Sequence, residues 1–434
     1  MRIVYIAAGA AGSYCGACKR DASLAKGIIA RGHDVMVIPL YTPLSLDEPD
    51  PSENEVFYGG ISVWLEDHSR IFRRRLPLID RLLDNPRLLG LLSRFGIETD
   101  PAKLGPMTVS VLKGADGRQR KELARLVEFL KSGDRPDVVH LTNTLLAGIA
   151  PAVAGELGCR VVCSLTGGES FLRSLPEPHR TEALDVLRRM AAAVDTFISP
   201  GESYADEMAG VLSVERSRIR VVRTGIDLSP YSEEAVRPAG PFRIGFLSRI
   251  VPDKGLDILA KAFRIICREG DGESVLAVAG QAMGEGAALW RELRDGLETD
   301  GLGERIEYAG ELTLGEKARF LAGLDVLALP SRKDERLAVS CIEAMASGTP
   351  LVVPNRGIFP EMIALTGGGV LVDPGGSEAG YAAAVAAALA ELRDSPARLA
   401  ELADAAREGV HRHYAMDVIA NAILDVYAGA PGAE

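Results

Sequence analysis

Short apolar runs alternate along the chain with longer segments whose apolar residues recur at helical spacing. The short runs are rich in β-branched residues, a composition typical of buried strands. They are "RIVYIAA", "DVMVIPL", "DVVHLT", "RVVCSL", "RIGFLS", "VLAVAG", "RIEYAG", "DVLALP" and "PLVVP". Because strands and helices alternate, the pattern predicts an α/β protein whose parallel sheets carry helices on both faces, the doubly wound architecture.

The alternation is interrupted once, by "LSPYSEEAVRPAGPF" between Leu228 and Phe242. This stretch is rich in Pro, Ser, Gly and acidic residues and is typical of an interdomain linker. Since 434 residues exceed the size of one hydrophobic core, we expect two α/β domains over residues 1–228 and 229–410. Residues 411–434 predict a final amphipathic helix, and docking back onto the N-terminal domain is one option for it.

The composition is that of a folded protein, with 47% hydrophobic and 25% charged residues. A formal net charge of -11 disfavours nucleic acid as a partner, because phosphate binding needs a concentrated positive field. No window reaches the roughly 18 apolar residues that span a bilayer, and "MRIVYIAAGAAG" lacks the features of a signal peptide. We therefore expect a cytoplasmic protein whose six cysteines are reduced.

Ligands of open α/β sheets bind outside the carboxyl ends of the strands, so the turns that follow strands are the places to search. In "FLSRIVPDKGLDILAKAF", Arg249 and Lys254 lie in the turn between a strand and a helix that starts near Gly255. Two cations beside a helix N-terminus, where free backbone N–H groups point outward, suit a phosphate. The alternative is a pair of solvated surface charges.

Two carboxylates stand out in "SRKDERLAVSCIEAMASGTP", where seven residues separate Glu335 from Glu343. If the whole segment were helical, they would lie about 12 Å apart along the axis, whereas bracketing one glycosidic bond needs roughly 5 to 9.5 Å. They could instead bind the two ends of a nucleotide sugar, with its diphosphate near the two cations. The alternative places Glu335 in a solvated first turn and Glu343 on the wet face, although Glu343 has apolar neighbours.

With these residues in view, the sequence resembles the retaining glycosyltransferases of family 4, which have the GT-B fold of two Rossmann-like domains facing across a cleft. The two glutamates together with the Arg/Lys pair are specific to that family, while either element alone is weak. The matching stretches follow the family's order over nearly the whole chain: "LAKGIIARGHDVMVIPL", "PDVVHLTNTLLAG", "RIRVVRTGIDLSPY", "LSRIVPDKGLDIL", "VLAVAG", "IEYAGELTLGEKARFLAGLDVLALPS" and "ERLAVSCIEAMASGTPLVVPNRGIFPEMI".

The resemblance implies a role for each matching residue. Arg249 and Lys254 would bind the donor diphosphate and stabilise charge on the leaving nucleotide. Glu335 would bind hydroxyls of the transferred sugar, and Glu343 would bind the ribose hydroxyls. The remaining implied donor-binding positions are Gly16, Gly310, Glu311, Leu312, Leu337, Ala338 and Val339.

The resemblance also implies the reaction. A hexose-type sugar would pass with retention from a nucleoside-diphosphate sugar, most commonly a UDP-sugar, to an unidentified hydroxyl acceptor. The leaving phosphate would help to deprotonate the acceptor, and the protein would stabilise an oxocarbenium-like state electrostatically. Neither a protein base nor a metal or other cofactor is required, because the basic pair neutralises the diphosphate.

The chain departs from the family pattern at two places. The family often has Glu-Pro-Phe-Gly where this chain has Glu335-Arg336-Leu337-Ala338, and often His-x-His where it has His140-Leu141-Thr142. These departures concern the sugar and the acceptor rather than the donor phosphates. Candidate residues on the acceptor side are Thr142, Asn143, Gly167 and Glu169.

Two further clusters leave alternatives open. Cys15 and Cys18 could form a redox pair or half a zinc site, but small thiols that shape a loop are the favoured interpretation. Arg70 and Arg73 to Arg75 precede leucines at helical spacing. They form either a basic surface that contacts anionic lipid at the inner face of the membrane or, as we favour, solvated arginines on a helical insertion. Alternative functions are a catalytically silent nucleotide-sugar-binding or membrane-recruitment protein, or a nucleotide-sugar hydrolase or epimerase.

Overall fold

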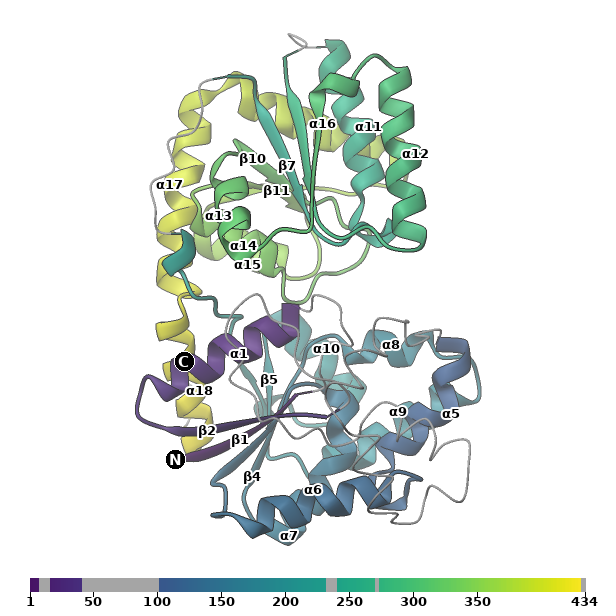
Figure 1. Ribbon diagram of the computed structural model, residues 1–434, viewed down its shortest axis with the longest axis vertical. Helices are drawn as coiled ribbons and strands as arrows, with labels where there is room; N and C mark the ends of the chain where they lie inside the picture. The colour runs from purple at the N-terminus through teal and green to yellow at the C-terminus, as the bar shows by residue number, and fades with distance from the viewer. Residues whose placement is uncertain (8–15, 41–100, 232–239, 270–272, 431–434) are drawn as a thin grey trace. The chain divides into compact units, whose positions relative to one another are not determined.

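The computed structural model describes residues 1–7, 16–40, 101–231, 240–269 and 273–430. The chain forms two compact units, one of Met1–Gly225 with Ile419–Glu434 and the other of Ile226–Val418. Each unit contains a parallel sheet with helices packed against it (Figure 1). The predicted α/β class with two doubly wound domains is therefore confirmed. The unit boundary lies at residue 225, close to the expected linker, of which residues 232–239 are outside the described part.

The first unit has a six-stranded sheet of order β2-β1-β3-β4-β5-β6, in which all neighbours are parallel. Its strands are β1 (Arg2–Ala7), β2 (Asp34–Pro39), β3 (Val138–Leu141), β4 (Arg160–Ser164), β5 (Thr196–Ser199) and β6 (Ile219–Val221). Its helices are α1 (Gly16–Ile29), α5 (Pro101–Leu112), α6 (Arg120–Ser132), α7 (Ala150–Leu157), α8 (Gly168–Ser174), α9 (His179–Ala191) and α10 (Glu202–Leu212).

The second unit has a six-stranded parallel sheet of order β12-β11-β10-β7-β8-β9. Its strands are β7 (Arg243–Leu247), β8 (Val275–Ala279), β9 (Ile306–Gly310), β10 (Val326–Ala328), β11 (Leu351–Pro354) and β12 (Gly369–Val372). In Figure 1, helices lie on both sides of this sheet. They are α11 (Leu256–Glu269), α12 (Glu285–Thr299), α13 (Leu314–Ala322), α14 (Val339–Ala346), α15 (Phe359–Thr366), α16 (Glu378–Asp394) and α17 (Pro396–His413), and α18 (Met416–Ala428) follows.

Strand order reverses once in each sheet, between β1 and β3 in the first and between β7 and β10 in the second. At such a switch point, the loops leaving two neighbouring strands run to opposite sides of the sheet and open a crevice at the carboxyl edge. The second sheet has the strand order of dinucleotide-binding folds. A ligand of the second unit is therefore expected beside the loops that follow β7 and β10.

The final helix expected over residues 411–434 corresponds to α18, but the first residues of that range belong to the end of the preceding helix. Helix α17 ends at His413, and α18 begins at Met416. Between them, Ile226 pairs with Ala415 in a parallel bridge, and the backbone N–H of Ile226 donates to the carbonyl oxygen of Tyr414 at 3.0 Å. An unbroken helix would need the same backbone groups for its own hydrogen bonds, so this pairing interrupts the helix. Most of α18, from Ile419 onward, belongs to the first unit.

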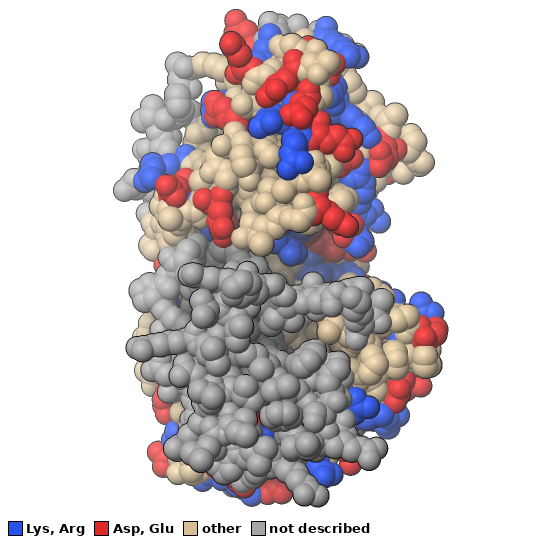
Figure 2. Space-filling model, turned by 45° about the vertical axis from the view of Figure 1, so that its right-hand side comes forward, with Lys and Arg blue, Asp and Glu red and all other residues tan. Residues whose placement is uncertain are grey.

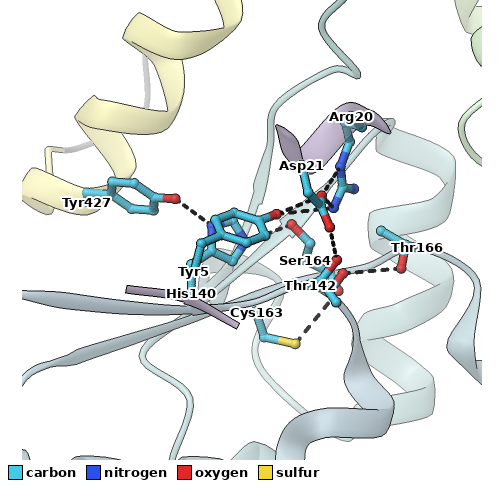
Figure 3. A network of polar contacts seen from close by, with 9 residues as sticks. All are labelled: Tyr5, Arg20, Asp21, His140, Thr142, Cys163, Ser164, Thr166 and Tyr427. Carbon is cyan, nitrogen blue, oxygen red and sulfur yellow. Dashed lines mark hydrogen bonds and ion pairs between the residues drawn. The ribbon is translucent and has the colours of Figure 1, made fainter. Parts of the chain in front are cut away.

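A buried polar network joins α18 to the first sheet (Figure 3). Its centre is His140 on β3, which is fully buried. The His140 ring contacts the Tyr427 hydroxyl of α18 through Nδ1 and lies 2.8 Å from Ser164 Oγ through Nε2. The Tyr5 ring packs on His140 with centroids 4.4 Å apart. Burial, and to a lesser extent the charge of Arg20, lowers the pKa of His140 well below its ordinary value.

Ala338 occupies the N-cap of α14 in the left-handed region, with φ 47° and ψ 42°. An L residue with a Cβ is strained there, because its side chain crowds the following carbonyl oxygen. Ala338 and Ser213 are the described residues other than glycine that have a positive φ. Helix α14 therefore starts at a conformation for which glycine is the favoured residue.

The buried imidazole makes the first unit sensitive to acid. Below about pH 6.5 the unfolded chain binds a proton that the folded chain does not, so stability falls as the pH falls. Between pH 7.5 and 5.5 this one group should cost about 1.4 kcal/mol of unfolding free energy. Urea unfolding followed by circular dichroism should show this loss in the wild type and a correspondingly smaller loss in His140→Gln. His411→Gln, an exposed histidine on α17, is the matched control and should behave as the wild type. Equal losses in all three proteins would contradict a neutral buried His140.

Replacing Ala338 by glycine should stabilise the second unit by about 1 kcal/mol, because glycine removes the Cβ strain of the left-handed position. Ala344→Gly is the matched control. Ala344 lies inside α14 and is fully buried, so this change should destabilise by about 1 kcal/mol or more. Urea unfolding of the two variants should thus shift in opposite directions. A destabilised Ala338→Gly protein would show that the methyl group contributes more than the strain costs.

Candidate functional site

The switch point of the second sheet carries a lysine and a glutamate in direct contact. Lys254 ends the 3-10 turn Pro252–Lys254 that follows β7, and Glu335 lies in the loop that follows β10. Lys254 Nζ is 2.6 Å from Glu335 Oε1, and the side chains are only 21% and 15% exposed. The structure therefore brings together two predicted site residues that are 81 positions apart in the chain.

Ser331 contacts the same carboxylate oxygen. Its hydroxyl Oγ lies 2.9 Å from Glu335 Oε1 and 3.1 Å from the carbonyl oxygen of Asp253, and the residue is fully buried. Glu335 Oε1 thus has an ammonium and a hydroxyl as neighbours. This arrangement fixes the direction of the carboxylate before any ligand arrives.

The loop that carries Glu335 is bonded through its backbone to the loops on both sides of it. On one side, the Arg332 N–H donates to the carbonyl oxygen of Asp253, at 2.8 Å. On the other side, the Ile358 N–H donates to the carbonyl oxygen of Glu335, at 3.0 Å, and Arg356 Nη1 donates to the carbonyl oxygen of Arg332, at 2.6 Å. Glu335 is therefore preorganised although it lies outside regular secondary structure.

Two glycines permit this close packing of loops. Gly255 has φ +74°, and a Cβ there would lie 1.9 Å from the carbonyl oxygen of Pro330. Gly357 has φ +60°, and a Cβ there would lie 2.8 Å from the backbone nitrogen and oxygen of Glu335. Both positions need glycine for the conformation and for the space, so any larger residue would displace the loop that carries Glu335.

A surface ion-pair network continues from this loop to two helices. Arg332 forms a bidentate pair with Asp257 of α11, at 2.7 and 2.5 Å, and contacts Glu378 of α16 at 2.6 Å. Lys261 also contacts Glu378 at 2.6 Å. The hydrogen bonds from Lys261 and Arg332 lower the pKa of Glu378 to about 2. Planar bidentate pairing makes the guanidinium of Arg332 a directional anchor for the loop.

The second predicted cation is Arg249, whose surroundings differ from those of Lys254. It follows β7 directly and is exposed, and it makes no ion pair within the part of the chain that the structure describes. Helix α11 begins at Leu256, immediately after the predicted Gly255. The turn therefore carries one cation that forms an ion pair with Glu335 and one that is exposed to solvent.

Glu343 is buried, with 2% exposure, so the alternative that places it on the wet face of α14 is wrong. Lys317 Nζ of α13 lies 3.0 Å from its Oε1, and the Tyr231 hydroxyl donates to the same oxygen at 2.8 Å. Helix α14 starts at Val339, which leaves Glu335 outside the helix. The case of one continuous helix over both glutamates is therefore not realised, and the alternative of a solvated first turn for Glu335 is wrong.

The other predicted donor-side residues lie at the ends of secondary structure elements. Gly310 ends β9 with φ +68°, Glu311 is exposed and accepts from Gln281 Nε2 at a long 3.4 Å, and Leu312 packs on the core. Leu337 is half-buried just before α14. Gly16 is the first residue of α1 in the first unit. Their roles in donor binding stay predictions.

The candidates on the acceptor side take part in contacts of the first unit. The Thr142 hydroxyl is buried and donates to Asp21, and the Asn143 side chain accepts from the N–H of Leu145 at 2.9 Å. Gly167 precedes α8 with φ 94°, and its N–H donates to the Tyr204 hydroxyl, which in turn donates to the fully buried Glu169. Acceptor binding by these four residues remains a prediction.

No group of metal-ligating side chains occurs among the described residues, and Cys159, Cys163, Cys267 and Cys341 form no disulfide there. Burial raises the pKa of the thiols of Cys163 and Cys341, which makes them poor nucleophiles. Cys15, the side chain of Cys18, and Arg70 to Arg75 fall outside the described residues, so neither the redox nor the membrane interpretation is tested.

The charges of the second unit are mixed in sign. Figure 2 shows Lys and Arg interspersed with Asp and Glu over the described residues in the upper part of the view. Within the described ranges, none of the helices is long and apolar enough to cross a bilayer.

Sequence reasoning missed Ser331, Lys317 and Tyr231, which contact the two glutamates. For Lys317 a signal existed, because it falls between Leu314 and Leu321 on the apolar face of α13, where a lysine is unexpected. Nothing in the sequence pattern distinguishes the other two. Ser331 follows a strand and Tyr231 lies in the linker-like segment, and both positions are commonly solvated.

Comparison with known proteins gives two family matches. Residues 230–407 match the model of "Glycosyl transferases group 1", and residues 106–230 match that of "Glycosyltransferase Family 4". Together these matches cover most of the described chain and meet at residue 230, close to the boundary between the two units.

The chain is also similar to curated and solved proteins. It is 30% identical over 426 residues to a D-inositol 3-phosphate glycosyltransferase of Xylanimonas cellulosilytica, covering 92% of this chain and 97% of the relative. It is 28% identical over 260 residues to the enzyme of the same name from Streptomyces avermitilis, covering 56% of this chain; the match spans about half, 53%, of that relative.

Among solved structures, HepE of Anabaena in complex with UDP-glucose has a TM-score of 0.65 at 16% identity, covering 99% of this chain and 100% of that one. At this identity the likeness shows the fold alone, and HepE is a protein with the same two Rossmann-like domains. The two family matches and the relative that aligns over nearly its whole length lead to one conclusion. The chain is a glycosyltransferase of family 4 with the GT-B fold.

Proposed function

We propose that the protein transfers a sugar from a nucleoside-diphosphate sugar to a hydroxyl acceptor with retention at the anomeric carbon. The observation that carries this proposal is the Lys254–Glu335 contact at the switch point of the second sheet. A cation suits a diphosphate, and a carboxylate accepts strong hydrogen bonds from sugar hydroxyls. The 2.6 Å contact puts these two groups at adjoining places, as the bond between phosphate and sugar requires.

Arg249 and Lys254 are the proposed ligands of the diphosphate, with the N-terminus of α11 beside them. Arg249 is exposed and can turn toward an incoming anion, while Lys254 can exchange part of its contact with Glu335 for a phosphate oxygen. Their charges offset the negative charge that develops on the leaving nucleotide. With two cations in these positions, the proposed reaction has no need of a metal ion.

Glu335 is proposed to accept hydrogen bonds from hydroxyls of the transferred sugar, and its preorganised loop supports this role. The bond between the anomeric carbon and the diphosphate oxygen breaks, and a bond from the same carbon to the acceptor oxygen forms on the same face. The acceptor proton passes to the departing phosphate oxygen, which balances the step. A carboxylate beside the ring also favours the positive charge of an oxocarbenium-like state.

A uridine donor is proposed first, because HepE was crystallised with UDP-glucose and the family most commonly uses uridine donors. Phosphorylated polyols are the first acceptors to test, because two relatives are named D-inositol 3-phosphate glycosyltransferases. Nuclear magnetic resonance of the product would give the anomeric configuration. An α-donor that yields a β-product would refute retention, and donor consumption without an acceptor would favour a hydrolase.

Removing either cation should weaken binding of the nucleoside diphosphate about tenfold to a hundredfold, the effect of losing one hydrogen bond to a charged group. Calorimetry with UDP, GDP and ADP should show this loss for Lys254→Met and for Arg249→Met. Lys261→Met is the control, because Lys261 is an exposed cation on the neighbouring helix α11. Unchanged affinity in both cation variants would remove the proposed diphosphate site.

Glu335→Gln should lower kcat/KM at least about a hundredfold while affinity for the sugar-free nucleotide is kept or raised. The variant loses a charged acceptor for sugar hydroxyls and also releases Lys254 from its ion pair. Initial rates and calorimetry on the same protein separate the two effects. Glu391→Gln, an exposed carboxylate on α16, should leave both values unchanged. Equal loss of nucleotide affinity and turnover in Glu335→Gln would mean that Glu335 does not act on the sugar.

A further inference from the structure

Glu343 belongs to a buried group of three polar side chains from separate elements. Lys317 comes from α13, Tyr231 ends the 3-10 turn Ser229–Tyr231, and Glu343 lies in α14. Lys317 and Glu343 are only 5% and 3% exposed in their side chains, and Tyr231 is 5% exposed. Both neighbours contact Oε1 of Glu343, Lys317 Nζ at 3.0 Å and the Tyr231 hydroxyl at 2.8 Å.

Such a group is expected to add little to the free energy of unfolding. Desolvating an ammonium and a carboxylate costs about as much as their attraction returns, and apolar side chains of similar volume pack at least as well. The pair does, however, hold a carboxylate as an anion in the interior. The Tyr231 hydroxyl adds a directional bond to the same oxygen, so Oε1 of Glu343 is held by two neighbours from separate elements.

The position of Glu343 in its helix places this group close to the loop that carries Glu335. Glu343 is four residues after Val339, the first residue of α14, or about 6 Å along the axis at 1.5 Å per residue. The start of α14 follows the loop that carries Glu335 at the switch point. A carboxylate one turn below that edge is within reach of a polar group on a ligand whose diphosphate lies at the edge.

We propose that Lys317 and Tyr231 are positioning residues for the ribose, because together they fix the charge and the direction of the Glu343 carboxylate that receives the ribose hydroxyls. This inference rests on the proposed donor site. Neither residue touches the nucleotide. Each acts through Glu343, so their removal should affect ribose recognition selectively and leave the diphosphate contacts of Arg249 and Lys254 in place.

The test compares a ribonucleotide with its counterpart that lacks both ribose hydroxyls. Whichever of UDP, GDP and ADP binds the wild type is measured by calorimetry beside its 2′,3′-dideoxy form. The wild type should prefer the ribonucleotide about tenfold or more, and Tyr231→Phe should reduce this preference about fivefold by weakening only the ribonucleotide. Lys317→Met should reduce it further. If Lys317→Met does not fold, Tyr231→Phe alone decides, since it removes a single oxygen.

Tyr381→Phe is the matched control. Tyr381 of α16 is a buried tyrosine of the same unit, and its hydroxyl has no hydrogen-bond partner in the described structure. This variant should keep the wild-type preference. A Tyr231→Phe protein that weakens both nucleotides equally, or that keeps the full preference, would overturn the inference while the donor site stands. A wild type that binds both forms equally would also overturn it, and a wild type that binds no nucleotide would refute the proposed function itself.

Discussion

The reversal of strand order beside β7 is the constraint on which the chemistry of the second unit depends. Because β8 and β10 lie on opposite sides of β7, the loops after β7 and β10 meet at one edge although 81 residues separate Lys254 from Glu335. Their ion pair is then reinforced by backbone bonds from Arg332 and Ile358 and by two glycines that let the loops approach. The sheet topology thus brings Lys254 and Glu335 to the same edge, and the packing of the loops fixes their positions.

The sequence predicted most of the fold because central parallel strands are buried on both faces and read as continuous apolar runs. Strands β1, β3, β4, β7, β8, β10 and β11 follow this rule. The edge strands β2 and β9 were also predicted, although part of their residues is exposed. Strands β5, β6 and β12 were not singled out, and three of the four residues of β12 are only half-buried. The break between α17 and α18 was not predictable from periodicity either, since it depends on the backbone of Ile226, nearly 190 positions earlier in the chain. A helical pattern carries no information about a partner so distant.

The types of the candidate site residues could be predicted from the sequence, but their contacts and their exposure to solvent could not. Spacing and charge singled out Lys254 and Glu335, yet only the structure shows that they neutralise each other while Arg249 stays exposed. The start of α14 at Val339 was not predicted, and it leaves Glu335 in the loop before the helix. Ala338 explains the difficulty, because a left-handed residue without glycine gives no signal of a helix boundary.

Two buried ion pairs lie near switch points, and their surroundings differ in a way that bears on function. In the first unit, Asp21 receives the Tyr5 hydroxyl, the Thr142 hydroxyl and the guanidinium of Arg20 (Figure 3). These hydrogen bonds to the Asp21 carboxylate link β1, β3 and α1, and such a network suits a structural role. In the second unit, Glu343 lies one turn inside a helix whose start borders the Lys254–Glu335 site. Since a buried pair contributes little net stability, we propose that its position there serves the ligand rather than the fold.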